Sequence, residues 1–258
     1  MDNRYGTATL VAVMLLLTAC GDDSLVNLGP PPPPLQSPSG IWIGPFTSET
    51  DGSVSNTLGI VSQDNDVQLV ASTISSRHYA GVVSTDGSTL VGTLNVFLGR
   101  VGPFIGSGGV QSITLDGTAT ERNDLFGDYS GSEDSGRFNL SYLSVYDDGS
   151  SLSLTSGNWI YSEASAGGAL YTVVFDIDNA GVLFGTDTAG CVYSGSVGLI
   201  DPETNGYSVT FEVTDCLLNN GNYTGLAWIS SIDGGQQNRL TMGLNKPNRA
   251  FAAPFQRL

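Results

Sequence analysis

The sequence predicts an all-β protein built from two tandem small antiparallel β-barrels that are related by an internal repeat. Three observations support this prediction. The chain has 34 glycines in 258 residues, and Ser, Thr, Val, Tyr and Phe are abundant, as is typical of strands joined by turns. No stretch of twelve residues has a clear helical period. Short motifs also recur in the same order in the two halves of the chain.

The first element is a short apolar run from Leu10 to Leu17. It is too short to cross a bilayer, which takes about 20 apolar residues, and its length suits a signal peptide. The run ends at Leu17-Thr18-Ala19-Cys20, which resembles the lipobox of bacterial lipoproteins. This resemblance implies that residues 1–19 are a signal peptide and that Cys20 carries a diacylglycerol and an N-acyl chain. The alternative is an ordinary buried element with a free cysteine.

The lipoprotein resemblance also implies a location in the bacterial cell envelope, with the membrane as a partner through the lipid anchor. Gly21 follows Cys20 at a place where Asp favours inner-membrane retention in Gram-negative lipoproteins, so the resemblance implies the outer membrane. Residues 20–38 are expected to form the lipidated start and a linker. Its five prolines, Pro30–Pro34, favour an extended helix that rises about 3.1 Å per residue. We interpret it as a spacer, with a docking site for a proline-binding module as the alternative.

The net charge is −16, and Lys246 is the only lysine. Nucleic-acid binding depends on Lys and Arg that neutralise phosphates, so this charge argues against a nucleic-acid partner. It equally disfavours direct adsorption of the protein surface to anionic lipid.

The two predicted barrels span residues 39–150 and 151–258. Three motif pairs support the repeat, and each pair occurs in the same order: Ser39–Ile43 with Ser156–Ile160, Tyr79–Val83 with Tyr193–Val197, and Asp128–Gly131 with Asn222–Gly225. In the second half, Val209, Phe211 and Val213 alternate with polar residues, as expected of a half-buried antiparallel strand. About eight such strands would close a small barrel.

Each half opens on Gly-x-Trp, at Gly40 and Gly157. This motif is similar to the first strand of lipocalins and to the opening of streptavidin. We expect Trp42 and Trp159 to fill the base of their own barrels, with a ligand contact as the alternative.

Cys191 and Cys216 flank a predicted hairpin. In an oxidising envelope compartment we expect them to form a disulfide. Closing a loop of about 25 residues (216 − 191) is worth roughly 3 kcal/mol in the chain-entropy model. A metal site or catalytic thiol pair is the alternative, but no His or Cys partner lies nearby in the sequence.

The sequence assigns no catalytic residue, no cofactor and no metal site. His78 is the only histidine, and no Gly-x-Ser-x-Gly motif accompanies it. Asp176, Asp178 and Asp187 distantly resemble a calcium loop, but Ala180 occupies one ligand place. Carboxylates are numerous, so a glycosidase pair remains open, although most of them lie in turn sequences.

The sharpest functional candidate is the Gly-rich apolar segment Phe97–Gly109. The second and third repeated motifs lie farther apart in the first half than in the second, and this segment lies in that extra length. Its expected contact residues form the interaction loop Phe97, Arg100, Phe104 and Ile105. The alternative is that the segment packs between the two halves as core.

These features predict a lipid-anchored cell-envelope protein that acts as a non-enzymatic binding or assembly component. Its partner would be an envelope protein or a ligand of unknown identity. The alternatives are an envelope-directed hydrolase and an inhibitor of a host or phage enzyme.

Overall fold

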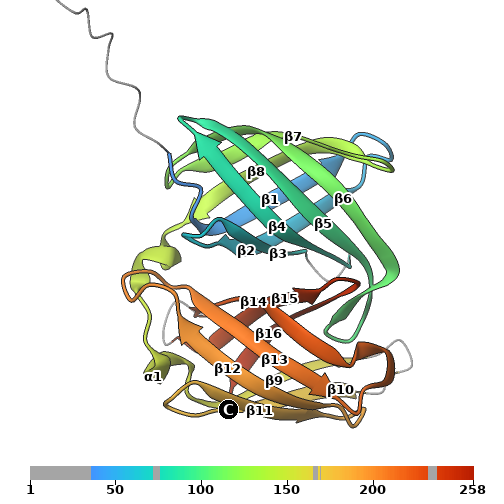
Figure 1. The fold of residues 1–258 in the computed structure, drawn as a ribbon, viewed down its shortest axis with the longest axis vertical. Coiled ribbons are helices and arrows are strands. Elements are labelled where there is room, and N and C mark those ends of the chain that lie inside the picture. The colour runs from blue at the N-terminus through green and yellow to red at the C-terminus, as the bar shows by residue number, and fades with distance from the viewer. Residues whose placement is uncertain (1–35, 72–75, 165–167, 169, 232–236) are drawn as a thin grey trace, which may run out of the picture. The chain divides into compact units, whose positions relative to one another are not determined.

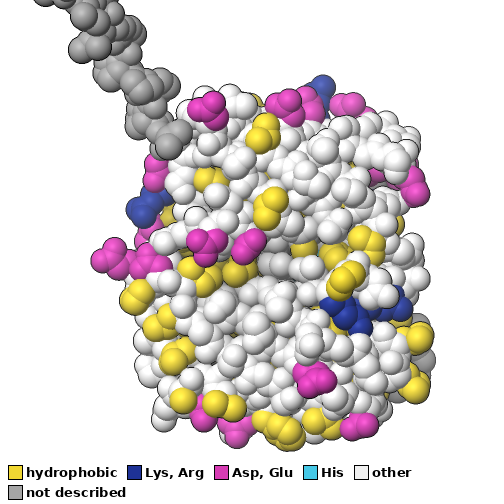
Figure 2. Space-filling model, in the orientation of Figure 1, with side chains coloured by type: hydrophobic (Ala, Val, Ile, Leu, Met, Phe, Trp, Pro, Cys, Tyr) yellow, Lys and Arg dark blue, Asp and Glu magenta, His cyan; other side chains and the backbone are white. Residues whose placement is uncertain are grey.

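The computed structural model describes residues 36–71, 76–164, 168, 170–231 and 237–258. The predicted signal peptide, Cys20 and the five prolines Pro30–Pro34 lie outside the described residues. The described chain is all-β, with sixteen strands and three short helical turns. Within these residues, no helix has the length and apolar content that a membrane crossing requires. Acidic side chains occur at many places over the face shown in Figure 2.

The first eight strands form a closed antiparallel barrel (Figure 1). Each strand pairs with the next, and β8 pairs back with β1, from Ile41 opposite Leu143 to Ser48 opposite Gly136. The strands are β1 Gly40–Ser48, β2 Val54–Val61, β3 Asp66–Ala71, β4 Arg77–Asp86, β5 Thr89–Val101, β6 Phe104–Thr120, β7 Asp124–Gly131 and β8 Ser135–Leu143.

A connection of two helical turns, η1 Ser144–Asp148 and α1 Leu152–Thr155, leads to eight further strands. These also pair in sequence order and antiparallel. The last strand pairs with β15, with β9 at two residue pairs, and with β6 at two residue pairs. The elements are β9 Gly157–Ala164, β10 Leu170–Ile177, β11 Val182–Asp187, β12 Val192–Leu199, β13 Tyr207–Thr214, η2 Leu217–Asn219, β14 Gly221–Ser230, β15 Arg239–Lys246 and β16 Arg249–Arg257.

The strands that carry Trp42 and Trp159, β1 and β9, share the same local arrangement around the indole ring. Trp42 and Trp159 are fully buried, and each indole N–H donates to the carbonyl four residues earlier, on Pro38 at 2.9 Å and on Thr155 at 2.7 Å. The residue opposite each Trp covers its ring: Tyr142 packs edge-on against Trp42, and the Arg257 guanidinium lies 4.3 Å from the Trp159 ring centre. Both side chains are buried in a core, as expected, and the place of Trp159 at the base of a second barrel stays a prediction.

The second motif pair also occupies equivalent strands, β4 and β12, the fourth strand of each set. A Cβ at Gly81 would lie 2.1 Å from the Thr93 carbonyl oxygen, and one at Gly195 would lie 2.0 Å from that of Thr210. Both positions therefore exclude any side chain, because the neighbouring strand approaches too closely.

The third motif pair is not equivalent, so that part of the repeat prediction is wrong. Tyr129 lies on β7, the seventh strand of the first set, whereas Tyr223 lies on β14, the sixth strand of the second. Both glycines of this pair, Gly131 and Gly225, still face a close neighbouring backbone or side chain. A Tyr-x-Gly motif therefore reports a local close approach and does not specify a strand's place in the order.

Cys191 and Cys216 are bonded, with their Cα atoms 4.6 Å apart, which confirms the predicted pairing. Cys191 directly precedes β12 and Cys216 follows β13, so the disulfide ties the open end of this hairpin.

Replacing Trp159 by Ala should lower the free energy of unfolding by about 3–5 kcal/mol, since it leaves a cavity and an uncovered guanidinium. Urea denaturation measures this change, with Trp159→Phe as the milder control. A loss below about 1 kcal/mol for Trp159→Ala would contradict the core role.

Candidate functional site

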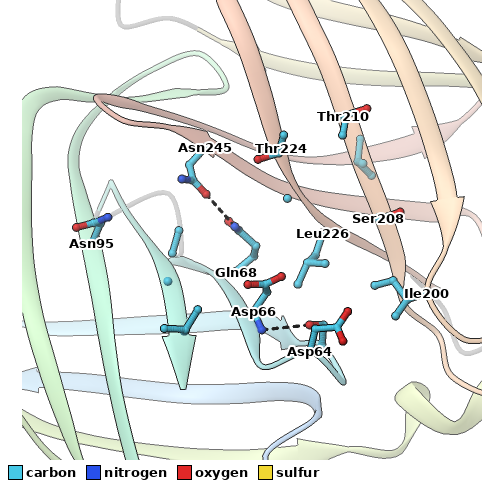
Figure 3. A pocket seen from close by; sticks show the side chains of 16 residues that line it. Asp64, Asp66, Gln68, Asn95, Ile200, Ser208, Thr210, Thr224, Leu226 and Asn245 are labelled. Atoms are coloured by element: carbon cyan, nitrogen blue, oxygen red, sulfur yellow. Dashed lines mark hydrogen bonds between the residues drawn. The ribbon is translucent and has the colours of Figure 1, made fainter. Parts of the chain in front are cut away.

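A polar cleft of about 410 Å³ lies between the first barrel and strands β13–β15 (Figure 3). We call it the polar cleft. Its side chains are mostly small and hydrogen-bonding. Those used below are Asp64, Asp66, Gln68, Asn95, Ser208, Thr210, Thr224 and Asn245.

Strand alternation places these side chains. On β3, Val67 and Leu69 enter the barrel core, so Asp66 and Gln68 point out of it into the cleft. On the facing side, Val209 lies in the core of the second set of strands, which leaves its neighbours Ser208 and Thr210 on the cleft side.

A chain of amides and an imidazole crosses from the first barrel to β15. Gln68 Nε2 donates to Asn245 Oδ1 at 2.9 Å, and Figure 3 shows the two side chains pointing toward each other. The Oε1 atom of Gln68 lies 2.6 Å from His78 Nε2. Because a carboxamide oxygen only accepts, His78 must carry its proton on Nε2.

His78 is therefore held as a neutral imidazole. It is fully buried, and its Nδ1 has no hydrogen-bond partner. Burial, with a smaller effect of the Arg100 charge, lowers the pKa of His78 to about 3. A general base needs access to substrate, and this side chain has none. It completes the hydrogen-bonded chain that runs through Gln68 to Asn245.

The acidic end of the cleft is formed by a tight turn. The backbone N–H of Asp66 donates to Ser62 Oγ at 3.1 Å, and Asn65 adopts a positive φ of 69°. Burial raises the pKa of the Asp66 carboxyl, and the negative charge of Asp64 adds to the effect. None of the described Lys and Arg residues lines the cleft. The cleft can thus accept hydroxyl groups or a cation, and it repels anions.

The predicted interaction loop is a β-hairpin. Phe97, Phe104 and Ile105 are at most 5% exposed, so the exposed apolar surface expected of them is wrong. Phe97 and Ile105 pack with Ala250 and Ala252 between the halves, while Phe104 enters the core of the second set.

The fourth expected contact residue, Arg100, is also turned inward. Its side chain is 7% exposed, and Nη2 donates to the Tyr161 hydroxyl at 2.7 Å. These side chains therefore make contacts within the chain and not the partner contact that was expected of the segment. The apolar side chain of this hairpin that does reach solvent is Val101, at 69% exposure.

The aspartates that resemble a calcium loop complete turns. Asp178 accepts backbone N–H groups of Ala180 and Val182, and Asp187 accepts those of Ala189 and Cys191. The Asp187 carboxylate also accepts the hydroxyls of the partly buried Tyr171 and the buried Tyr193. Asp187 lies close to both cysteines, but their sulfur atoms are bonded to each other.

The cleft residues were not singled out by the sequence. Their polar side chains alternate with core residues, which is also the pattern of a strand face in contact with water. Only the docking of one set of strands against the other turns these faces toward a shared cavity.

No protein-family model, curated protein sequence or solved structure matches this chain.

The single histidine permits a direct test of its protonation state. We expect the His78 Hε1 NMR signal to stay constant from pH 8 to pH 5 in folded protein and to titrate near 6.5 in urea. Between pH 6.5 and pH 5, His78 binds a proton in the unfolded state but not in the folded state. Stability should therefore fall as pH drops below 6.5, by at most about 1.4 kcal/mol per pH unit from this group. A folded-state midpoint between 6 and 7 would contradict the buried neutral assignment.

Proposed function

We propose that this chain is a lipid-anchored cell-envelope binding protein, built from two tandem barrels, that takes a small hydroxyl-rich ligand into the polar cleft. The ligand class is a saccharide unit of the kind found in envelope glycans. The observation that carries the proposal is a cavity between the halves where hydroxyl, amide and carboxylate side chains converge beside an apolar part of the wall that includes Val82, Ile200 and Leu226.

Three observations support a second barrel in residues 151–258. The pairing of β16 with both β15 and β9 joins the last strand of the set to its first. The Trp42 and Trp159 strands share their buried indole contact, and Gly81 and Gly195 share their close backbone approach.

The lining chemistry selects the ligand class. Sugar hydroxyls both donate and accept, and so do the hydroxyls of Ser208, Thr210 and Thr224. The carboxylates of Asp64 and Asp66 are strong acceptors for hydroxyl donors at the acidic end. A volume of about 410 Å³ lies within the range of small-molecule sites.

A binding test uses isothermal calorimetry of purified protein with a panel of mono- and disaccharides, amino sugars included. Thr224→Val removes one cleft hydroxyl at nearly constant shape and should weaken binding about threefold to tenfold. Asp66→Asn should weaken it by about tenfold or more, since an ionised acceptor is lost. Thr186→Val, on the exposed face of β11, is the matched control and should bind as wild type. Equal affinity for all four proteins would contradict the cleft as the site.

A hydrolase is the second candidate, favoured by one observation. The pKa of Asp66 is raised and a second carboxylate, Asp64, lies beside it at the same end of the cleft. Such a pair can divide acid and base roles in glycoside cleavage. Release of reducing ends from an envelope glycan, abolished by Asp66→Asn, would favour the hydrolase; binding without release favours the binding protein.

The anchor proposal rests on the Leu17–Cys20 motif and the proline tract that follows it. Cys20→Ser should shift the protein from the membrane pellet to the soluble fraction, because two or more acyl chains are needed for stable anchoring. Intact mass of the membrane-extracted wild type should show the lipid on Cys20. A Cys20→Ser protein that still sediments with membranes would contradict the proposal.

A further inference from the structure

A second cavity, of about 300 Å³, lies between the same two halves and shares no lining residue with the polar cleft. Its position follows from the outward face of β3, where Val70 comes two residues after Gln68. The walls are largely apolar and include Ile43, Leu58 and Pro254. We call it the arginine pocket, because Arg100 and Arg239 both line it.

Two guanidinium groups in one apolar pocket are unusual in so acidic a protein. The chain has nine Lys and Arg residues, of which Arg4 lies outside the described part, so two of eight described cations meet here. Among the residues that the structure describes, no Asp or Glu lines the pocket. This clustering of positive charge has no counterpart in the polar cleft.

Both arginines retain unused donors. The Nε atoms of Arg100 and Arg239 are buried and have no hydrogen-bond partner. Arg100 is only 7% exposed; its Nη2 binds the Tyr161 hydroxyl and, at 3.4 Å, the Ala252 carbonyl. Buried donors are normally satisfied, so neither guanidinium has its hydrogen bonding completed by the described chain.

Glu163 compensates only part of this charge. Its Oε2 lies 3.7 Å from Arg100 Nε, outside hydrogen-bond distance, and its side chain is 33% exposed. No ion pair of Arg239 is found among the described residues. One positive charge therefore remains at the pocket without a counter-ion from the described chain.

We propose that the arginine pocket binds an anionic amphiphile, a carboxylate or phosphate head on a short apolar chain. The planar guanidinium fork matches either head in a bidentate manner. The aliphatic wall accepts the chain. At about 30 Å³ for each non-hydrogen atom, the cavity holds roughly ten such atoms, which fits a chain of about ten carbons with its head at the rim. This site is independent of the ligand proposed for the polar cleft.

Calorimetry with four ten-carbon probes tests the proposal. The full-length chain with Cys20→Ser avoids competition from its own acyl groups, and each probe stays below its micellar concentration. Decanoate and decyl phosphate should bind, and the tighter of the two identifies the headgroup. Decanol and decyltrimethylammonium should bind at least tenfold more weakly, and inorganic phosphate should not bind measurably.

Variants locate the site. Arg239→Gln should weaken decanoate binding at least tenfold, whereas Arg137→Gln makes the same charge change on a side chain that is 74% exposed and should bind as wild type. Thr224→Val, in the polar cleft, should also have no effect. Arg239 is used because Arg100 makes contacts that folding needs. Equal affinities for decanol and decanoate, unchanged binding by Arg239→Gln, or no binding of either anion would overturn the proposal.

Discussion

The structure depends on one hairpin that belongs to both halves. Strands β5 and β6 extend beyond the first barrel as a hairpin, and there β6 pairs with β16 at Phe104–Phe251 and Ile105–Ala250 (Figure 1). Phe104 packs there with Tyr193, Tyr223 and Phe251 in the second core. Removing a buried Phe costs about 3–5 kcal/mol, so this contact is a large share of a domain's stability. Because it joins the two halves, both cavities between them depend on it.

The surface between the halves is divided by chemistry. Ile41, Ile60 and Trp228 belong to one apolar cluster. Phe97 and Ala252 belong to another. His78, Gln68 and Asn245 form a chain of hydrogen bonds between the halves. Because hydrogen bonds require particular distances and directions, this chain favours one arrangement of the two halves over others. The outward face of β3 accordingly runs from the acidic end of the polar cleft to the apolar wall of the arginine pocket.

Much of the fold could be predicted from local sequence patterns. Period-two alternation around Val209 and Phe211, the Trp strands and the cysteine spacing predicted strands, core and disulfide correctly. The same rules failed for Phe97–Gly109. Apolar residues in a Gly-rich segment predict either a docking surface or core, and the choice depends on contacts with β16, which lies about 150 residues later in the chain. The cleft residues could not be predicted either, because they also depend on contacts between segments far apart in the chain. A polar strand face has the same sequence pattern whether water or a neighbouring strand covers it.

If the β5–β6 hairpin joins the two sets of strands, they should unfold as one cooperative unit. This can be measured by urea unfolding of Trp42→Phe and Trp159→Phe, each followed by fluorescence of the remaining indoles and by far-UV circular dichroism. We expect one transition for each protein, with coincident midpoints for the two probes. Phe104→Ala should lower that shared midpoint, although the residue belongs to a strand of the first barrel. Two separate transitions in either Trp variant, with Phe104→Ala leaving both in place, would contradict it.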